Sequence, residues 1–416
     1  MAQNVVMHCD CNAFYFTCEA SRKPSLHGKA VVVGGDEEAR HGIVLAKSDL
    51  AKAAGIKTGN ALWEARQKYP SLIILPPNYD LYLYLSRRTR EIFGDYTDRI
   101  EPFGLDEAWL DLTGNETLHT AKLLSDKIRK RFISELGLTA SIGIANNKIF
   151  AKLGSDYKKP DASTLITPDD YERMVWTLPA SELLYVGAAT AKKLTRFGIN
   201  TIGDIAHTSI EHIRLMLGKN GEMLHAFARG EDLSRVALMG SAPEVKSIGN
   251  STTTPRDLVS NDEVRLTFWV LAESVAERLR EHGFKARTLQ IHVRDNALNA
   301  FERQMSLPRP TQLAFELVET GMDLFRRCYH FDKQLPIRSV GIRGCNLIPA
   351  NGIAQMSMFE EENKRSKLEI VENTMDEIRA RYGHFAIQRA SLLTDRIGSI
   401  NPKDDNTIHP VSYLIA

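Results

Sequence analysis

Near its N-terminus the chain reads Val5-Val6-Met7-His8-Cys9-Asp10, and further along it reads Leu105-Asp106-Glu107-Ala108-Trp109-Leu110. In each stretch, an apolar run that favours a β-strand adjoins one or two carboxylates. Such carboxylates suit divalent cations, because hard ions such as Mg²⁺ prefer oxygen ligands. Two ions roughly 3.5–4 Å apart can stabilise the attacking and leaving oxygens of a phosphoryl transfer. Taken singly, each acid could equally be a solvated residue at a strand end.

The bulk properties indicate a multidomain globular protein. A chain of 416 residues is too long for one hydrophobic core and predicts roughly two to four domains. The composition, with 43% hydrophobic and 25% charged residues, is that of an ordinary soluble protein. We find no long apolar run and no signal peptide, so we expect no membrane span and a cytoplasmic location.

The cysteines favour a reduced chain. There are five, an odd number, and no pair is spaced as Cys-x-x-Cys, which argues against a disulfide scaffold. A zinc site near His8 is the alternative. However, strand alternation places Cys9 and Cys11 on one face and Asp10 on the other, and no second ligand cluster completes a site.

The net charge of +1 lacks the basic surplus common in nucleic-acid-binding proteins. Any DNA binding must therefore come from local basic patches and should be modest and sensitive to salt. If the protein does act on DNA, we expect it to leave DNA easily and to depend on a partner to stay bound.

Four motifs follow one another along the chain. They are Asp10-x-Asn12-x-Phe14-Tyr15-x-x-x-Glu19, Leu105-Asp106-Glu107-Ala108, Ser141-Ile142-Gly143-Ile144-Ala145-Asn146-Asn147-Lys148 and Asp156-Tyr157-Lys158-Lys159-Pro160. Taken together and in this order, they resemble those of the Y family of translesion DNA polymerases. Within that family the chain is most similar to the bacterial polymerase IV branch, and Asn12-Ala13-Phe14-Tyr15 is similar to the catalytic subunit of polymerase V.

The resemblance implies an α+β multidomain, right-hand polymerase. Periodicity agrees with this where it is clear, for example in the helical spacing near Ala121–Ile128 and the alternation of Arg287–Arg294. The implied domains are a ferredoxin-like palm (1–13 and 78–170), small fingers (14–77), a helical thumb with a helix-hairpin-helix (171–233), a linker (234–245), an α/β little finger (246–349) and a C-terminal tail with a clamp-binding motif (350–416).

By the same resemblance, Asp10, Asp106 and Glu107 are the catalytic carboxylates. Asp10 and Asp106 would bridge two Mg²⁺ ions, for which Mn²⁺ can substitute, and Glu107 would ligate the first ion. The backbone carbonyl of Cys11 would face the second ion, so the side chain at this position is not constrained.

The incoming deoxynucleoside triphosphate would lie beside Phe14 and Tyr15. Tyr15 matches the family's steric gate, which rejects a 2′-hydroxyl; the alternative is a packed aromatic residue between palm and fingers. Lys159 and Lys52 would bind the triphosphate. Lys52 stands where the family more often has Arg and so loses the bidentate fork. Asp49 replaces the family's usual Tyr and cannot itself favour a triphosphate.

DNA contacts are expected in two places. In the thumb, Gly187, Thr190 and Lys192 belong to the helix-hairpin-helix, whose backbone amides bind phosphate. Tyr185 replaces the usual first glycine of this loop, and a plain helical hairpin is the alternative. In the little finger, the expected phosphate contacts are Arg287, Arg294, Arg338 and Arg343. Each of these arginines could also be part of a solvated strand face.

Near the C-terminus, Gln355-Met356-Ser357-Met358-Phe359 resembles a sliding-clamp-binding peptide. Gln355 would hydrogen-bond while Met358 and Phe359 fill an apolar pocket. In residues 363–416 a helix face is predicted at Leu368, Val371, Met375 and Ile378. That helix could pack on the little finger or bind a partner.

The resemblance thus implies a monomeric, template-directed and low-fidelity DNA polymerase. It would extend primer-template DNA past damaged bases, without proofreading, as a mutator in DNA repair and the SOS response. One alternative is a non-catalytic scaffold recruited to the clamp, although the metal-binding acids are retained. Another is a nucleotidyl cyclase, for which the helix-hairpin-helix and the clamp motif have no use.

Overall fold

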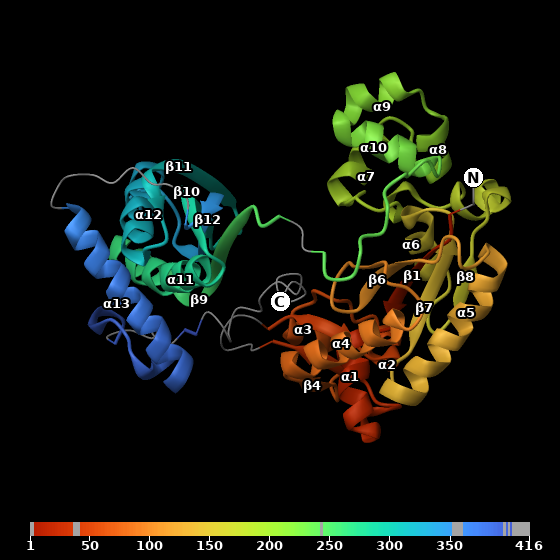
Figure 1. Cartoon of the computed structure of the whole chain (residues 1–416), viewed down its shortest axis with the longest axis horizontal. Coiled ribbons are helices and arrows are strands. Elements are labelled where there is room, and N and C mark those ends of the chain that lie inside the picture. Colours follow the sequence, from red (N-terminus) through yellow and green to blue (C-terminus); the bar gives the residue numbers. More distant parts are fainter. Residues whose placement is uncertain are drawn as a thin grey trace. The chain divides into compact units, whose positions relative to one another are not determined.

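The computed structural model describes residues 4–35, 42–241, 244–351, 361–393, 397 and 400–401. Most of these residues form two compact units, 4–35 with 43–241 and 244–401 (Figure 1). Both units combine sheets and helices, as predicted for the fold class. No helix in the described ranges has both the length and the apolar character needed to cross a bilayer.

A five-stranded sheet forms the centre of the first unit. Its strand order is β5-β6-β1-β7-β8, in which only β7 and β8 run parallel to each other. β1 is completely buried because it pairs with β6 on one side and β7 on the other. The strands are β1 (Val6–Cys11), β5 (Ile100–Pro102), β6 (Glu107–Asp111), β7 (Ala140–Ala145) and β8 (Ser163–Leu165).

The two faces of this sheet belong to different hydrophobic cores. Met7, Cys9 and Cys11 point into a core shared with α1, α4 and α5. Val6 and Trp109 point into the other core, which includes α6 and the helices that follow. The strand alternation predicted for Cys9 and Cys11 is therefore confirmed. The helices are α1 (Phe14–Arg22), α4 (Tyr79–Gly94), α5 (Leu118–Arg131) with the π-helical turn Phe132–Leu136, and α6 (Lys148–Tyr157).

Between α1 and α4 the chain forms a small three-stranded sheet with its own apolar core. The strand order is β3-β2-β4, and β2 pairs antiparallel to β3 and parallel to β4. Ser48 caps the following short helix, and Gly55 at φ +78° ends the turn after it. The elements are η1 (Pro24–Leu26), β2 (Val31–Gly34), β3 (Val44–Lys47), α2 (Asp49–Ala53), α3 (Leu62–Lys68) and β4 (Ile73–Leu75).

After β8 the first unit is entirely helical, as the sequence predicts. Thr201 and Asp204 form a reciprocal capping box at the start of α8. Figure 1 shows α8 and α9 beside α10. The helices after β8 are η3 (Pro168–Asp170), η4 (Tyr171–Val175), η5 (Ala180–Glu182), α7 (Ala188–Arg196), α8 (Ile202–His207), α9 (Ile210–Leu217) and α10 (Lys219–Ala228).

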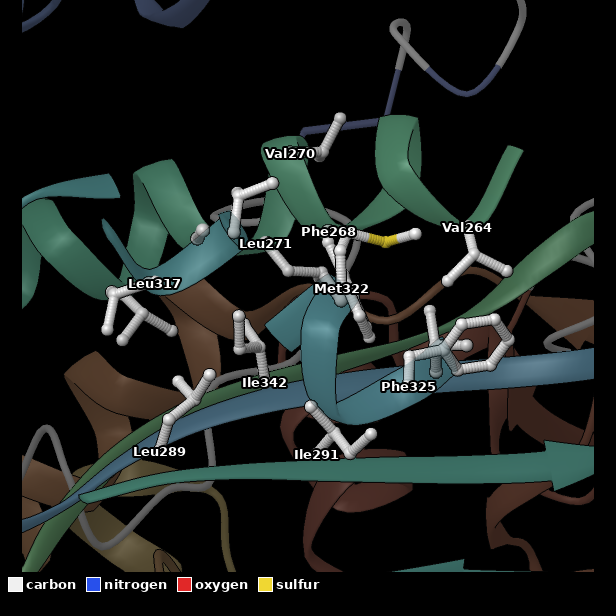
Figure 2. Packing of buried hydrophobic residues seen from close by; sticks show 14 of the residues in the cluster. Val264, Phe268, Val270, Leu271, Leu289, Ile291, Leu317, Met322, Phe325 and Ile342 are labelled. Atoms are coloured by element: carbon white, nitrogen blue, oxygen red, sulfur yellow. The ribbon is translucent and has the colours of Figure 1, made fainter. Parts of the chain in front are cut away.

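The second unit has an antiparallel sheet of order β11-β10-β12-β9, with α11 and α12 packed on one face. Figure 2 shows Phe268 and Leu271 of α11 and Met322 of α12 directed toward the strand residues Leu289 and Ile342. The predicted strand at 287–294 lies within β10. The elements are β9 (Ser247–Leu258), α11 (Asn261–Glu281), β10 (Phe284–Asp295), β11 (Ala300–Thr311), α12 (Ala314–Cys328) and β12 (Ile337–Pro349).

The described residues after position 360 are part of this second unit. They include α13 (Glu361–Tyr382), η6 (His384–Ala386) and η7 (Ala390–Leu392), and α13 contacts α11. The sequence left open whether this helix packs on the little finger or binds a partner; in the structure Glu372 and Arg379 are buried against α11, whereas Val371 is 51% exposed. These two residues of α13 are buried because each forms an ion pair with α11: Glu372 with Arg280 and Arg379 with Glu273.

Candidate active site

Adjacent strands bring the predicted carboxylates together. In the register of β1 and β6, Asp10 lies directly opposite Glu107. Asp106 precedes β6, and its carbonyl oxygen accepts a hydrogen bond of 2.9 Å from the backbone N–H of Cys11. Asp10 is buried, and the other two acids are half-buried. The end of β1 and the start of β6 thus form one acidic site.

The loop that carries Asp106 is held by α4. The hydroxyl of Ser86 donates to the carbonyl oxygen of Leu105. The guanidinium of Arg90 donates to Ser86 Oγ at 2.9 Å and to the carbonyl oxygen of Gly104 at 3.3 Å. Gly104 itself has φ +153°, which few other residues adopt. The side chains of Ser86 and Arg90 therefore hold the backbone of the two residues that precede Asp106.

Two lysines neutralise the acids in this structure. Lys159 Nζ lies 2.8 Å from both Asp10 Oδ2 and Asp156 Oδ1. Lys152 of α6 donates to Glu107. The prediction for Lys159 rested on a motif, and the structure does place this residue at the acidic site. Sequence reasoning missed Lys152, although its spacing of four from Asp156 on a helix was a usable signal.

Burial and neighbouring charges shift the pKa values of all three acids. Burial, followed by the nearby charges of Asp10 and Glu107, raises the pKa of Asp106 to about 7. Burial also raises the pKa of Asp10, although Lys159 opposes this shift. For Glu107 the burial effect is outweighed by His8 and Lys152, which lower the pKa to about 2. The site therefore has an excess of negative charge that a cation would relieve.

His8 is a further residue that the sequence reading did not assign to the site. It is fully buried, with Nδ1 2.8 Å from Ser155 Oγ and Nε2 3.3 Å from Glu107 Oε2. Nε2 has no hydrogen bond of good geometry, although it lies beside the Glu107 carboxylate. Burial lowers the pKa of His8 to about 4, and the ring is neutral at pH 7. His8 lies two residues before Asp10 on the same strand, so strand alternation could have predicted that both side chains face the same side of the sheet.

The donor set at this site fits a divalent metal. Among the residues that the structure describes, no group of three or more carboxylates, thiols or imidazoles is arranged as a metal site, and lysine ammonium groups lie against Asp10 and Glu107. Carboxylate oxygens are what hard cations prefer. The ammonium groups of Lys159 and Lys152 balance the negative charges of Asp10 and Glu107. The negative charge that they leave unbalanced is that of Asp106.

Aromatic side chains border the acids. Phe14 and Tyr15 begin α1, immediately after β1, and their ring centroids lie 5.9 Å apart. Burial raises the pKa of Tyr15 to about 12, and Tyr79 and Asp106 add to this shift, so the phenol lies near the acidic site. Lys52 and Asp49 are exposed on α2, and no contact between Lys52 and the carboxylates is present in the described chain.

The predicted hairpin loop precedes α7. Tyr185 adopts φ +71°, the left-handed conformation that glycine usually supplies. Gly187 is the N-cap of α7, and Thr190 and Lys192 lie on this helix, with Lys192 exposed. The loop therefore keeps a glycine-like backbone despite its tyrosine.

The remaining predicted residues lie in or beyond the second unit. Arg287, Arg294 and Arg343 are exposed on β10 and β12, and Arg338 is half-buried. The clamp-like motif Gln355, Met358 and Phe359 lies outside the described residues.

Comparison with known proteins gives a consistent result. Residues 9–156 match the impB/mucB/samB family, 245–358 match its C-terminal domain, and 182–232 match the thumb domain of DNA polymerase-iota. A protein named DNA polymerase IV from Acetivibrio thermocellus is 44% identical over 95% of this chain and 98% of its own length. Its namesake from Moorella thermoacetica is 36% identical over 94% and 96%, respectively.

The fold has a solved counterpart. A Y-family DNA polymerase chimera of Dbh and Dpo4 superposes with a TM-score of 0.73 at 22% identity, covering 83% of this chain and 99% of the chimera. This similarity concerns the fold alone. With the thumb match, it agrees with the predicted right-hand architecture of palm, fingers, thumb and little finger.

Proposed function

This chain belongs to the Y family of DNA polymerases, the impB/mucB/samB family, and from that premise we propose how its residues carry out translesion synthesis. The protein is a DNA-directed DNA polymerase. We propose that it extends primer-template DNA with deoxynucleoside triphosphates, at low fidelity and without proofreading, in DNA repair. The domain boundaries predicted above are part of this proposal.

The observation that carries the proposal is the pairing of Asp10 with Glu107 beside Asp106. When bound there, Mg²⁺ would activate the primer 3′-hydroxyl and stabilise the leaving pyrophosphate. Asp10, Asp106, Glu107 and the carbonyl of Cys11 would hold two such ions, and Mn²⁺ could replace them. The raised pKa of Asp106, to about 7, supports a site whose charge is balanced by cations.

The other residues would bind and orient the nucleotide. When a nucleotide binds, the ammonium group of Lys159 would leave Asp10 and bind the triphosphate oxygens, because a phosphate group is the stronger anionic partner. Phe14 and Tyr15 would contact the sugar, with Tyr15 excluding a 2′-hydroxyl. Lys52 would supply a point charge to the triphosphate rather than a bidentate contact.

DNA would be held by phosphate contacts that read no sequence. In the thumb, Gly187 and Thr190 would offer backbone amides and Lys192 a charge. Arg287, Arg294 and Arg338 would add contacts from the little finger. With a net charge of only +1, this grip would be weak and salt-sensitive.

We further propose that Gln355, Met358 and Phe359 bind the sliding clamp and so hold this polymerase at the primer. This part rests on the sequence motif alone. A monomer that acts on chromosomal DNA in the cytoplasm, as a mutator induced in the SOS response, completes the proposal.

Primer extension tests the catalytic core. Wild type and Asp106→Asn are compared on an undamaged template with Mg²⁺, and Asp169→Asn, which alters an exposed acid, is the matched control. Extension by wild type and control that is lost in Asp106→Asn supports the proposal. If wild type fails to extend even with clamp and loader present, or if Asp106→Asn remains active, the proposed site is wrong and a scaffold role gains weight.

A further inference from the structure

The ring of Tyr15 rests on a second tyrosine that is distant in the sequence. The rings of Tyr15 and Tyr82 are stacked, with centroids 4.4 Å apart and planes 12° from parallel. Tyr79 packs edge-on against both, at 5.9 Å from Tyr15 and 5.7 Å from Tyr82. Phe14 tilts against the same pair of rings. The orientation of Tyr15 therefore depends on where Tyr82 is held.

Tyr82 is in turn held by a buried carboxylate. Its side chain is fully buried, and its hydroxyl donates a hydrogen bond of 2.8 Å to Glu19 Oε1. Glu19 is only 8% exposed and follows Tyr15 by one helical turn on α1, so both side chains face α4. A hydrogen bond to a buried carboxylate is stronger and more directional than one between neutral groups.

We propose that Glu19 is a positioning residue for sugar selection: through Tyr82 it fixes the ring against which the sugar of the incoming nucleotide is tested. This inference rests on the proposed function, in which Tyr15 is the steric gate. The Glu19 carboxylate accepts the hydrogen bond of Tyr82, and its effect on Tyr15 passes through two aromatic rings.

The physical reason is that the hydrogen bond between Tyr82 and Glu19 restrains the motion of the Tyr15 ring. A steric gate rejects a 2′-hydroxyl only if its ring cannot tilt aside. Stacking alone permits sliding of the rings, because offset geometries are similar in energy. The hydrogen bond to Glu19 fixes the far end of Tyr82 and so removes this freedom. Burial and the adjacent carboxylate raise the pKa of Tyr82 well above its ordinary value, and the phenol keeps the proton that it donates.

The first test is nucleotide discrimination, measured as kcat/KM for a deoxynucleotide divided by that for the matching ribonucleotide. Tyr82→Phe keeps the ring and removes the hydroxyl, and Glu19→Gln keeps the size and removes the charge. Tyr84→Phe, on an exposed residue of the same helix, is the matched control. We expect the ratio to fall about 5- to 30-fold in Tyr82→Phe, less in Glu19→Gln and not at all in the control.

A double variant identifies the route of the effect. If Glu19 acts only through Tyr82, Glu19→Gln adds nothing in the Tyr82→Phe background. Independent, additive losses would overturn the proposed route, as would an unchanged ratio in Tyr82→Phe enzyme that incorporates deoxynucleotides normally.

A second measurement needs no polymerase activity. In protein carrying ¹³C-labelled tyrosine, the ring signals of Tyr15 report how fast its ring flips, and Tyr15→Phe assigns them. We expect faster flipping in Glu19→Gln and Tyr82→Phe than in Tyr84→Phe. Unchanged ring motion would refute the positioning role. Loss of nucleotide incorporation by wild type, with the expected ring motion retained, would instead refute the proposed function.

Discussion

Glu273 of α11 and Arg379 of α13 form an ion pair of 2.7 Å in which both side chains are almost completely buried. Arg389, from the segment after α13, reaches the same carboxylate at 2.6 Å. A second pair, Arg280 with Glu372 at 2.6 Å, joins the same two helices. Figure 2 shows Val270 pointing from α11 away from the sheet, and this buried residue shares the core with Leu392, Ile397 and Ile400. The described residues of α13 and of the chain after it are thus an integral part of the second unit.

Breaking this pair should destabilise the second unit. Arg379→Met leaves the buried carboxylate of Glu273 with only Arg389, and the loss of a buried partner typically costs about 3–5 kcal/mol. We expect amide hydrogen exchange in α11 to accelerate accordingly, because local protection reports the free energy of opening. Arg381→Met, on an exposed arginine of the same helix, is the control. Equal protection in both variants would show that the pair is not stabilising.

Divalent metal should stabilise the folded protein through the carboxylates. At a concentration of 100 times its dissociation constant, a ligand that binds only the folded state adds about 2.7 kcal/mol to the free energy of unfolding. We expect Mg²⁺ to raise the Tm of wild type above its value in EDTA, and Asp106→Asn to lose this increase. In EDTA, Asp106→Asn should be at least as stable as wild type, since it removes a crowded charge. An identical response to Mg²⁺ in both proteins would argue against metal at these acids.

Removal of the Lys159 ammonium should weaken nucleotide binding. Because a hydrogen bond to a charged group contributes about 1.5–3 kcal/mol, we expect Lys159→Ala to raise the KM for deoxynucleotides roughly 10- to 100-fold. Lys159→Arg keeps the charge and should restore part of the loss. The exposed neighbour Lys158 provides the control, Lys158→Ala. Steady-state kinetics that show the same KM in both alanine variants would exclude this role.

The backbone at Tyr185 should be strained. The left-handed conformation at φ +71° costs a non-glycine residue roughly 1–2 kcal/mol. Tyr185→Gly should therefore stabilise the helices around α7 by about 1 kcal/mol, less what is lost from the contact of its ring with Phe227 at 6.3 Å. Tyr185→Ala loses the same ring contact but keeps the strain. If thermal unfolding finds the alanine variant as stable as the glycine variant, the strain is not significant.

The sequence predicted the elements whose patterns are local. The strand before Asp10, the helix near Ala121–Ile128 and the strand at Arg287–Arg294 all appear as expected, because each has a clear period. The apolar spacing of residues 368–378 predicted a helix but left its partner open, whereas the structure shows α13 packed on α11 through Glu372 and Arg379. The charges that attract these side chains lie on α11, which local periodicity cannot reveal.

By itself the sequence determined the family and the acidic set of Asp10, Asp106 and Glu107, because a motif is carried by consecutive residues. Only the tertiary structure decided what surrounds those acids. Lys152 reaches Glu107, Ser155 meets His8, and Glu19 holds Tyr82. Strand alternation and helical spacing determine which way a side chain faces, but they do not determine which residue it contacts. That neighbour is supplied by a distant part of the chain, and only packing of the whole unit brings the two together.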